Sequence, residues 1–351
     1  IKNWDAYENE LYKRLGSDDN LLRYIINKAK QAPKRVIFAE AENLKILKAA
    51  QIVNDEGIAI PILLGKKEKI NALIEEHGLQ LENIQIIDPK CDSMEDKRYE
   101  YGQKFFEKRQ RKGYNLYEAK KVMRERAYFG SMMLANGEAD ALISGITRKY
   151  QDMLRPALQI IGMKKEVKRV AGMYMMLTKK GPIFFADASV NFNPTEDELV
   201  DITVLAAKEV ENFNIKPRIA MLSYSNFGSS DSAEAILVRN AVAKLKATHP
   251  ELIVDGEMQA SVAFNQELMK ENYPFSALVN ETPNVFIFPN LSAGNIAYNL
   301  LQEIGGAEAI GPILLGLNKP VHVLQLGSTV RQIVNMVAIS VVEAQLKSSK
   351  K

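Results

Sequence analysis

Cysteine and histidine are scarce in this sequence. Its 351 residues include one cysteine, Cys91, and three widely spaced histidines, His77, His249 and His322. A single cysteine cannot form a disulfide within the chain, and such usage is typical of proteins from a reducing cytosol. So few thiol and imidazole ligands also argue against a zinc site. We therefore expect a cytoplasmic protein with no disulfide and no metal site of its own.

Long apolar runs and a strong charge excess are missing too. No apolar stretch approaches the roughly 20 residues that a membrane-spanning helix needs, and no secretory signal is visible. The 46 basic and 43 acidic residues leave a net charge of +3, which gives no sign of a nucleic-acid or membrane surface. The common glycine-rich dinucleotide, P-loop and nucleophile-elbow motifs are also absent, so these enzyme classes have no motif support.

What the sequence does contain is a regular succession of short apolar runs and amphipathic segments. In the first half, apolar runs at 35–41, 58–65, 83–88 and 139–145 alternate with stretches of helical periodicity, the last two over 93–112 and 116–136. The runs are continuously apolar, as expected for strands that are covered on both faces. This alternation predicts parallel βαβ units.

The second half begins differently. The apolar runs "VAGMYMMLT" and "GPIFFADAS" meet at "KKGP", which predicts a hairpin. Alternation then resumes and ends in a long terminal helix. We therefore predict an α/β fold of two domains, with mostly parallel sheets and a cleft between them. The first domain would comprise 33–150 plus 313–351, and the second 151–312.

Residues 1–32 stand apart from this pattern. Trp4, Tyr7, Leu11 and Leu15 fall at helical spacing and form an apolar seam. The seam fits packing on the chain's own core, and equally a connector helix that docks on a preceding domain. The chain starts with Ile1 rather than methionine, so we interpret it as a fragment or a trimmed form of a longer protein.

Three turns at strand ends combine glycine with hydroxyl or amide side chains, at 223–235, 289–299 and 325–332. Glycine lets the backbone approach a ligand, and free N–H and hydroxyl groups there suit a phosphate. Each turn alone is also explained as a plain helix cap. Because all three follow presumed parallel strands, we predict one shared crevice for a phosphate-bearing ligand. The candidate binding residues are Ser225, Asn226, Ser229, Asn290, Asn295, Gly327 and Ser328.

Charged side chains complete the set of candidates. Arg109, in the basic run "KRQRK", and Arg155, in "LRPALQ", carry guanidinium groups that suit phosphate oxygens; a solvated helix face also explains the basic run. Asp187, Asp255 and Glu257 stand near strand ends, where carboxylates act as bases, hold Mg²⁺ or cap turns.

Many collinear blocks, among them "FADASVNFNPTEDEL", "LSYSNFGSS", "VDGEMQ" and "FPNLSAGNIAY", resemble the phosphate acetyltransferase (phosphotransacetylase) family over about 35–345. This family interconverts acetyl-CoA plus phosphate with acetyl phosphate plus CoA. The whole chain also resembles the C-terminal domain of large bacterial NADP-dependent malic enzymes. The resemblance implies a phosphotransacetylase or isocitrate/isopropylmalate dehydrogenase-like fold, and a homodimer or higher oligomer formed through the second domain.

The sequence departs from the family where the resemblance places the chemistry. The family's Asn-Asp pair becomes His322 and Val323, and its transition-state serine and arginine become Gln325 and Leu326. The aspartate assigned as the base for the CoA thiol becomes Gln332. In two other blocks Phe227 replaces a lysine and Ser261 an aspartate. No residue is left as a confident catalytic candidate.

These exchanges remove charge and proton-accepting capacity. A thiol of pKa about 8.5 needs a base or a positive field to ionise at neutral pH, and Gln332 supplies neither. The resemblance therefore implies a module that binds acetyl-CoA or CoA, with phosphate or acetyl phosphate, and lets acetyl-CoA regulate an attached malic enzyme. No group would be bound covalently, and NADP and a divalent metal would belong to the upstream malic enzyme part.

Two alternatives remain open. In one, the chain is a working phosphate acetyltransferase with His322 as base and Arg109 and Arg155 on phosphate, although a strand histidine bonded to the backbone is the simpler explanation of His322. In the other, the chain is a dimerising scaffold with an empty cleft.

Overall fold

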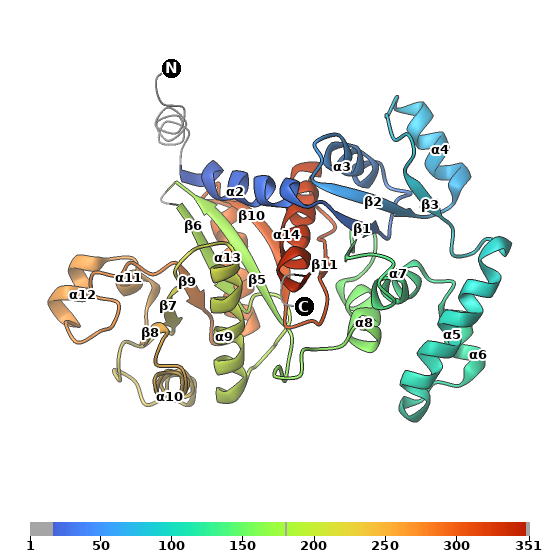
Figure 1. The fold of residues 1–351 in the computed structure, drawn as a ribbon. Coiled ribbons are helices and arrows are strands. Elements are labelled where there is room, and N and C mark those ends of the chain that lie inside the picture. Colours follow the sequence, from blue (N-terminus) through green and yellow to red (C-terminus); the bar gives the residue numbers. More distant parts are fainter. Residues whose placement is uncertain (1–16, 180, 349–351) are drawn as a thin grey trace, which may run out of the picture. The chain divides into compact units, whose positions relative to one another are not determined.

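The chain forms two compact α/β units, each built around its own sheet (Figure 1). The computed structural model describes residues 17–179 and 181–348. The five-stranded unit comprises 23–164 and 317–348, and the six-stranded unit comprises 17–22, 165–179 and 181–316. The boundaries drawn from the sequence stood at 150 and 312. The apolar seam from Trp4 to Leu15 lies outside the described residues.

The described strands of the five-stranded unit run parallel in the order β11-β4-β1-β2-β3. Their bounds are β1 Lys34–Phe38, β2 Ala59–Leu64, β3 Gln85–Ile87, β4 Ala141–Ser144 and β11 Val321–Val323. β1 and β4 are buried along most of their length, which agrees with their continuously apolar sequences.

The helices of this unit lie before, between and after its strands along the chain, with three in succession between β3 and β4. They are α2 Ser17–Gln31, which begins in the other unit, α3 Leu44–Asp55, α4 Lys67–Glu76, α5 Glu95–Arg109, α6 Leu116–Val122, α7 Arg126–Ala135, α8 Tyr150–Ile160 and α14 Val330–Ser348. The terminal helix α14 packs on α3 and on strands β1 and β4, so the C-terminal segment completes a core that the N-terminal half begins.

One helix prediction was wrong. The stretch 116–136, expected as a single helical run, is divided into α6 and α7 by a break at residues 123–125. Asn115 and Glu118 form a capping box at the start of α6, a pattern that fixes a helix N-terminus. The break brings Arg124 and Glu125 to the surface, where both line a pocket described below.

The six-stranded unit has a mixed sheet in the order β10-β5-β6-β9-β7-β8. The strands are β5 Ala171–Thr178, β6 Gly181–Ala186, β7 Arg218–Leu222, β8 Ile253–Met258, β9 Val285–Ile287 and β10 Glu308–Leu315. β5 pairs antiparallel with β6, which confirms the predicted hairpin, and also with β10. The other described neighbours in this sheet are parallel.

Aromatic side chains fill the core of the six-stranded unit. The Tyr174 and Tyr298 rings stack with centroids 4.1 Å apart, and Phe185 meets Phe286 and Phe288 edge to face. The helices of the six-stranded unit are α9 Glu196–Asn212, α10 Ala233–Thr248, α11 Ala260–Ala263, α12 Gln266–Asn272 and α13 Leu291–Glu303.

The predicted α/β class with mostly parallel sheets is confirmed. In the described part of the chain, no helix combines the length and apolarity needed to cross a bilayer.

Candidate functional site

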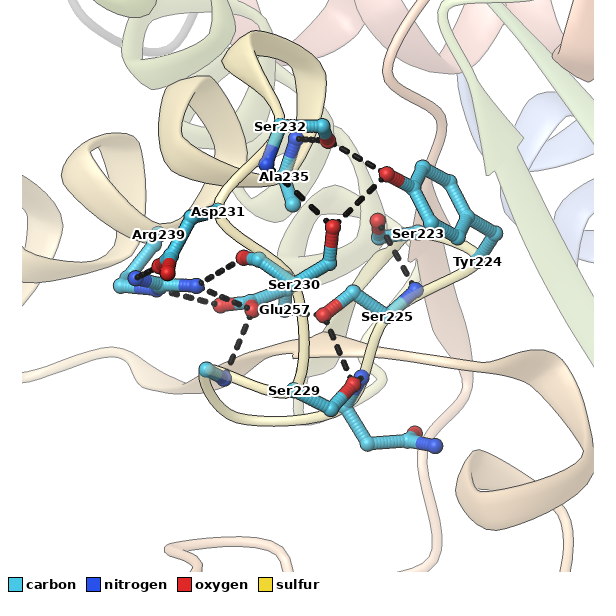
Figure 2. A network of polar contacts seen from close by, with 12 residues as sticks. Ser223, Tyr224, Ser225, Ser229, Ser230, Asp231, Ser232, Ala235, Arg239 and Glu257 are labelled. Carbon is cyan, nitrogen blue, oxygen red and sulfur yellow. Dashed lines mark hydrogen bonds and ion pairs between the residues drawn. The ribbon is translucent and has the colours of Figure 1, made fainter.

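The turn between β7 and α10 is organised around one buried carboxylate. This serine turn, residues 223–230, wraps around Glu257, whose side chain is fully buried (Figure 2). Glu257 accepts hydrogen bonds from the Ser225 hydroxyl at 3.1 Å and from the Gly228 N–H at 2.8 Å. A buried carboxylate that receives several donors fixes the groups that donate to it.

Arg239 on α10 supplies the charge that balances Glu257. Its Nη2 lies 3.1 Å from Glu257 Oε1 and also donates to the Ser230 carbonyl at 2.7 Å. Burial raises the pKa of Glu257, but the hydrogen bonds from Arg239, Gly228 and Ser225 outweigh burial and leave this pKa below its ordinary value. The carboxylate is therefore ionised at neutral pH and acts as the anchor of the turn.

The hydroxyls of the serine turn are already positioned. Ser225 Oγ lies 3.0 Å from Ser229 Oγ, which in turn accepts the Asn226 N–H at 3.0 Å. The Tyr224 hydroxyl lies 2.9 Å from Ser230 Oγ. Ser225 is buried, whereas Ser229 is exposed. The structure thus brings three predicted binding residues, Ser225, Asn226 and Ser229, into one hydrogen-bonded turn.

Phe227 stands where the family resemblance placed a lysine. Its backbone has a positive φ of 44°, and its ring packs on Tyr273 and Phe275 with centroids 4.8 and 5.1 Å away. The exchange therefore replaces a cation with a member of an aromatic cluster. Residue 227 therefore contributes no positive charge to the serine turn.

The second predicted turn, at the start of α13, lies beside the serine turn in the same unit. Asn290 caps α13 by accepting the Ala293 N–H at 2.9 Å, and its amide reaches Glu234 on α10 at 3.3 Å. The Asn295 amide donates to the Ala188 carbonyl at 3.4 Å. A Cβ on Gly294 would lie 2.6 Å from the Asp187 carbonyl oxygen, so this position needs glycine for close approach.

The other two acidic candidates serve as loop anchors. Buried Asp187 accepts the backbone N–H groups of Ser189 at 2.9 Å and Asn191 at 2.9 Å. Burial raises the pKa of Asp187, and these donors act in the opposite direction. Asp255 binds Lys246 at 2.6 Å and the Ala277 N–H at 2.8 Å. These contacts agree with the turn-capping alternative.

The third predicted turn, residues 325–329, belongs to the five-stranded unit. The Ser328 hydroxyl accepts the Gln325 N–H at 3.1 Å, and Lys45 donates to the Ser328 carbonyl at 3.1 Å. Leu326 is 69% exposed. Gln332 caps α14: its Oε1 accepts the Thr329 N–H at 2.9 Å, and its own N–H reaches Thr329 Oγ1 at 3.2 Å. An uncharged capping residue thus occupies the position that the resemblance gave to a base.

His322 lies in the core of this unit. Its side chain is fully buried on β11, and Nε2 lies 3.3 Å from Glu343 Oε1 on α14. A base must reach the proton that it removes, and a histidine enclosed between a strand and a helix has no open path to a substrate. This placement favours a structural role for His322.

Four arginines are among the residues that line a pocket of about 390 Å³ in the five-stranded unit. This arginine pocket is lined by Ala39, Glu40, Glu42, Lys90, Arg124, Glu125, Arg126, Ala127, Tyr128, Thr147, Arg148, Asp152, Met153 and Arg155. Arg126 pairs with Glu42, and Arg148 lies 3.9 Å from Glu125. Arg155 is exposed and has no ion pair among residues 17–179 and 181–348, which leaves its guanidinium group available to an anion.

Tyr128 is a residue whose hydroxyl is affected by the charges of both predicted arginines, Arg109 and Arg155. Burial raises the pKa of Tyr128 and its contact with Tyr114 adds to this, whereas the positive charges of Arg155 and Arg109 lower it. Both guanidinium groups therefore lie close enough to act on the same hydroxyl. Arg109 Nε is buried, with no hydrogen-bond partner in the part of the chain that the structure describes. No pattern in the sequence singled out Tyr128.

Glu40 is a second residue that sequence reasoning missed. Its carboxylate, 7% exposed, accepts the backbone N–H groups of Gly145, Ile146 and Thr147, the latter two at 2.7 and 3.0 Å. It thereby fixes the loop from β4 to α8, the helix that carries Arg155. Three successive N–H groups around one carboxylate form the kind of cradle that binds anions.

Each unit thus holds its own group of predicted residues. The six-stranded unit brings together the serine turn and Asn290, and the five-stranded unit brings together Arg109 and Arg155. Across the described residues, no group of three or more His, Cys, Asp or Glu side chains could hold a metal ion. The ligand chemistry is therefore that of hydroxyls, amides and guanidinium groups, which suits an anionic oxygen ligand.

Two units with mostly parallel sheets and hydroxyl- or amide-bearing turns at strand ends define the class: a two-unit α/β protein. Comparison with known proteins gives the family. Residues 20–341 match the model of the phosphate acetyl/butaryl transferase family, and the chain belongs to this family. A phosphotransacetylase structure from Streptococcus pyogenes is 35% identical with a TM-score of 0.87, and covers 93% of this chain and 99% of its own.

Two kinds of curated relative match at similar identity. An NADP-dependent malic enzyme of Haemophilus influenzae is 40% identical over 98% of this chain, and a phosphate acetyltransferase of Clostridium acetobutylicum is 38% identical over 93%. The chain spans 46% of the malic enzyme and 99% of the acetyltransferase. It therefore covers about half the length of the malic enzymes it matches, and nearly all of a free-standing acetyltransferase.

Proposed function

We propose that this phosphotransacetylase-like chain binds acetyl-CoA as a regulatory ligand and carries out little or no acyl transfer. The observation that carries the proposal is the contrast within the five-stranded unit. Arg155 and the half-buried Arg109 remain beside Tyr128, whereas Leu326 and Gln332 leave the 325–332 segment without a charged or proton-accepting group at the positions that differ from the family.

The physical argument separates binding from chemistry. Guanidinium groups hold phosphate and pyrophosphate oxygens whatever happens at the thioester. Acyl transfer needs a thiolate and a donor for the charge that develops, and loss of one such donor slows a reaction by about 10²–10³. A neutral capping glutamine and an exposed leucine supply neither.

Ligand binding is tested by calorimetric titration of the chain with acetyl-CoA, together with thermal unfolding. We expect saturable binding and a Tm that rises with ligand concentration, since a ligand of the native state stabilises it. Arg155→Ala should weaken binding about tenfold or more, given the usual strength of hydrogen bonds to charged groups. Lys104→Ala, which removes an exposed partner of Glu100 on α5, serves as the control. Absence of binding would leave the scaffold alternative.

A working phosphate acetyltransferase is the second candidate. Its support is the Clostridium acetobutylicum relative, which this chain matches over 99% of that protein's length at an identity close to that of the malic enzyme relative. Incubation with CoA and acetyl phosphate, followed by thioester absorbance, distinguishes the two. Turnover well above the uncatalysed rate would overturn the regulatory proposal. The burial of His322 speaks against this residue as the base.

We further propose that the regulated partner is a malic enzyme part of the same polypeptide, which would carry the NADP and divalent-metal sites. The support is the match to malic enzymes over 98% of this chain but 46% of the relative. The test is to compare malate oxidation by the full-length protein with and without acetyl-CoA, and again with Arg155→Ala. Inhibition of the parent protein that the variant loses would support the proposal; inhibition unchanged in the variant would contradict it.

Self-association is the remaining expectation from the family, and one surface supports it. On α13 and just after it, Ile296, Leu300 and Ile304 are 58%, 53% and 82% exposed at a spacing of four residues. A contiguous exposed apolar stripe of this kind marks an interaction site. Leu300→Glu should shift light-scattering mass toward the monomer, whereas Ile60→Glu, at an exposed apolar residue of the other unit, should not.

A further inference from the structure

A second groove lies on the α5–α6 pair of the five-stranded unit. This tyrosine groove encloses about 390 Å³ and is lined by Glu95, Arg98, Tyr99, Tyr117, Lys120, Lys121 and Arg124. It shares only Arg124 with the arginine pocket. None of the predicted binding residues lines it, so it is separate from the proposed acetyl-CoA site.

Close packing of the two helices sets the width of the groove. A Cβ on Gly102 of α5 would lie 2.7 Å from Lys120 Cγ and 2.8 Å from Lys120 Cα on α6. The glycine therefore allows the α6 backbone to lie directly on α5. On α5, Gly102 lies one helical turn from Tyr99, and on α6, Lys120 lies one helical turn from Tyr117, so this contact brings both tyrosines near Lys120.

Two aromatic rings stand open at the groove. Tyr99 is 49% exposed and Tyr117 is 73% exposed, which is unusual for side chains that gain by burial. Lys120 Nζ lies 3.6 Å from the centroid of the Tyr99 ring, a cation–π contact that orients this ring. Tyr117 makes no ring contact in the described part of the chain and offers its face to a planar ligand.

The side chains around these rings are mostly cationic, and two of them form no ion pair with the residues that the structure describes. Four cationic side chains face one carboxylate, Glu95, in the lining. Arg98 is occupied, because it donates to the carbonyls of Pro89 and Cys91. Lys121 and Arg124, both exposed, have no side-chain hydrogen bond or ion pair with any residue that the structure describes. Two free cations therefore stand beside an open aromatic ring.

We propose that the tyrosine groove binds a nucleoside phosphate, with the base stacked on Tyr117 and the phosphates on Lys121 and Arg124. Aromatic side chains stack on any base, and guanidinium and ammonium groups hold phosphate oxygens. The volume is that of a small-molecule pocket. The lining supplies one open aromatic ring and two cations without an ion pair among the described residues, which is enough for one base and its phosphates, so a mononucleotide is the ligand that fits.

The experiment is calorimetric titration of the chain with ADP, repeated with adenosine and with tripolyphosphate. We expect saturable ADP binding that neither adenosine nor tripolyphosphate matches. Tyr117→Ala and Lys121→Ala should each weaken ADP binding about tenfold, as expected for loss of one stacking partner or one charge-assisted contact. Lys104→Ala, on α5 and paired with Glu100 outside the groove, should leave ADP binding unchanged.

Acetyl-CoA, which itself contains an adenosine nucleotide, separates this site from the proposed regulatory site. Arg155→Ala should weaken acetyl-CoA but not ADP, and Tyr117→Ala should weaken ADP. If Arg155→Ala weakens ADP and Tyr117→Ala does not, the nucleotide lies in the arginine pocket and the inference is wrong. It is equally wrong if ADP does not bind at millimolar concentration, or if tripolyphosphate binds as tightly as ADP. None of these results decides the acetyl-CoA proposal, which is tested separately by titration with acetyl-CoA.

Discussion

The serine turn of the six-stranded unit and the 325–329 turn of the five-stranded unit look alike in sequence and differ in construction. The serine turn surrounds a fully buried, ionised Glu257 that is balanced by Arg239. The other turn is fixed by hydrogen bonds within residues 325–332 and by Lys45, which donates to the Ser328 carbonyl, and it leaves Leu326 69% exposed. The serine turn thus has a buried ion pair beneath its hydroxyls, whereas the 325–332 segment has neutral side chains at Leu326 and Gln332.

This difference bears on the proposed separation of ligand binding from acyl transfer. A buried charge is costly unless it is paired and hydrogen-bonded, and Glu257, paired with Arg239, positions the hydroxyls of the serine turn. The exposed leucine contributes little to stability, so nothing in packing demands it. The contrast to be tested is therefore between ordered hydroxyls on a charged anchor in one turn and neutral side chains at Leu326 and Gln332 in the other segment.

The largest expected effect comes from restoring the family's groups. Gln325→Ser, Leu326→Arg and Gln332→Asp, combined, should raise the rate of acetyl phosphate formation by about 10²–10³, because a charge donor and a base return to the 325–332 segment. Exposed Leu326 accepts an arginine without loss of packing, and aspartate can still cap α14. Release of CoA from acetyl-CoA in the presence of phosphate measures this rate.

The control for this variant is Leu326→Gln, which adds polarity without charge and should leave the rate at the parent level. If the triple variant is no faster than the parent chain, the missing groups are not what limits the chemistry. The contrast between the two turns would then have no catalytic meaning.

The second effect tests the charged support of the serine turn. Arg239→Ala leaves the buried Glu257 carboxylate without its cation, which should lower the free energy of unfolding more than loss of an exposed ion pair does. Urea denaturation followed by circular dichroism measures this change. Glu281→Ala in the same unit removes an exposed pair with Lys216 and should cost less than about 1 kcal/mol. Equal effects of the two variants would mean that Glu257 is not an anchor.

Much of this architecture was predictable from the sequence, because periodicity reports burial along one element. The continuously apolar runs marked the strands, and the hairpin at residues 179–182 followed from its turn residues. The break between α6 and α7 was missed because the segment keeps helical periodicity through residues 123–125. The spacing of apolar residues along one segment does not show where a helix ends, because that position also depends on how the helix packs against other elements.

The site was predictable only in part. Hydroxyl and amide residues after strands pointed to Ser225 and Asn290, since strand ends are where α/β proteins bind ligands. Arg239 carried no signal, because it lies 18 positions from Glu257 on a helix whose face has other charges. Glu40 was missed for a similar reason: it contacts a loop more than 100 residues away. Pairings between elements depend on topology, which composition and spacing do not encode.

The third effect concerns pH. Since the pKa of Glu257 in the folded chain lies below its ordinary value, its contribution to stability is present above the unfolded-state pKa and is lost as the pH falls through the folded-state pKa. Glu257→Gln should therefore be less stable than the parent by about 2 kcal/mol at neutral pH. Below the ordinary carboxyl pKa this difference should shrink. A difference that stays constant down to acid pH would show that the charge of Glu257 is not what stabilises the turn.

The smallest effect concerns Glu40, the carboxylate that fixes the loop before α8. Glu40→Gln keeps the shape and one acceptor oxygen, but its amide N–H₂ group would face backbone N–H donors that now meet a carboxylate. We expect a loss of about 1 kcal/mol in the free energy of unfolding, together with weaker acetyl-CoA binding, because the loop leads into the helix that carries Arg155. Glu68→Gln, at an exposed position of α4, is the control. If Glu40→Gln lowers stability while acetyl-CoA affinity stays at the parent value, the loop supports the fold alone, and the retained binding geometry does not extend to this part of the five-stranded unit.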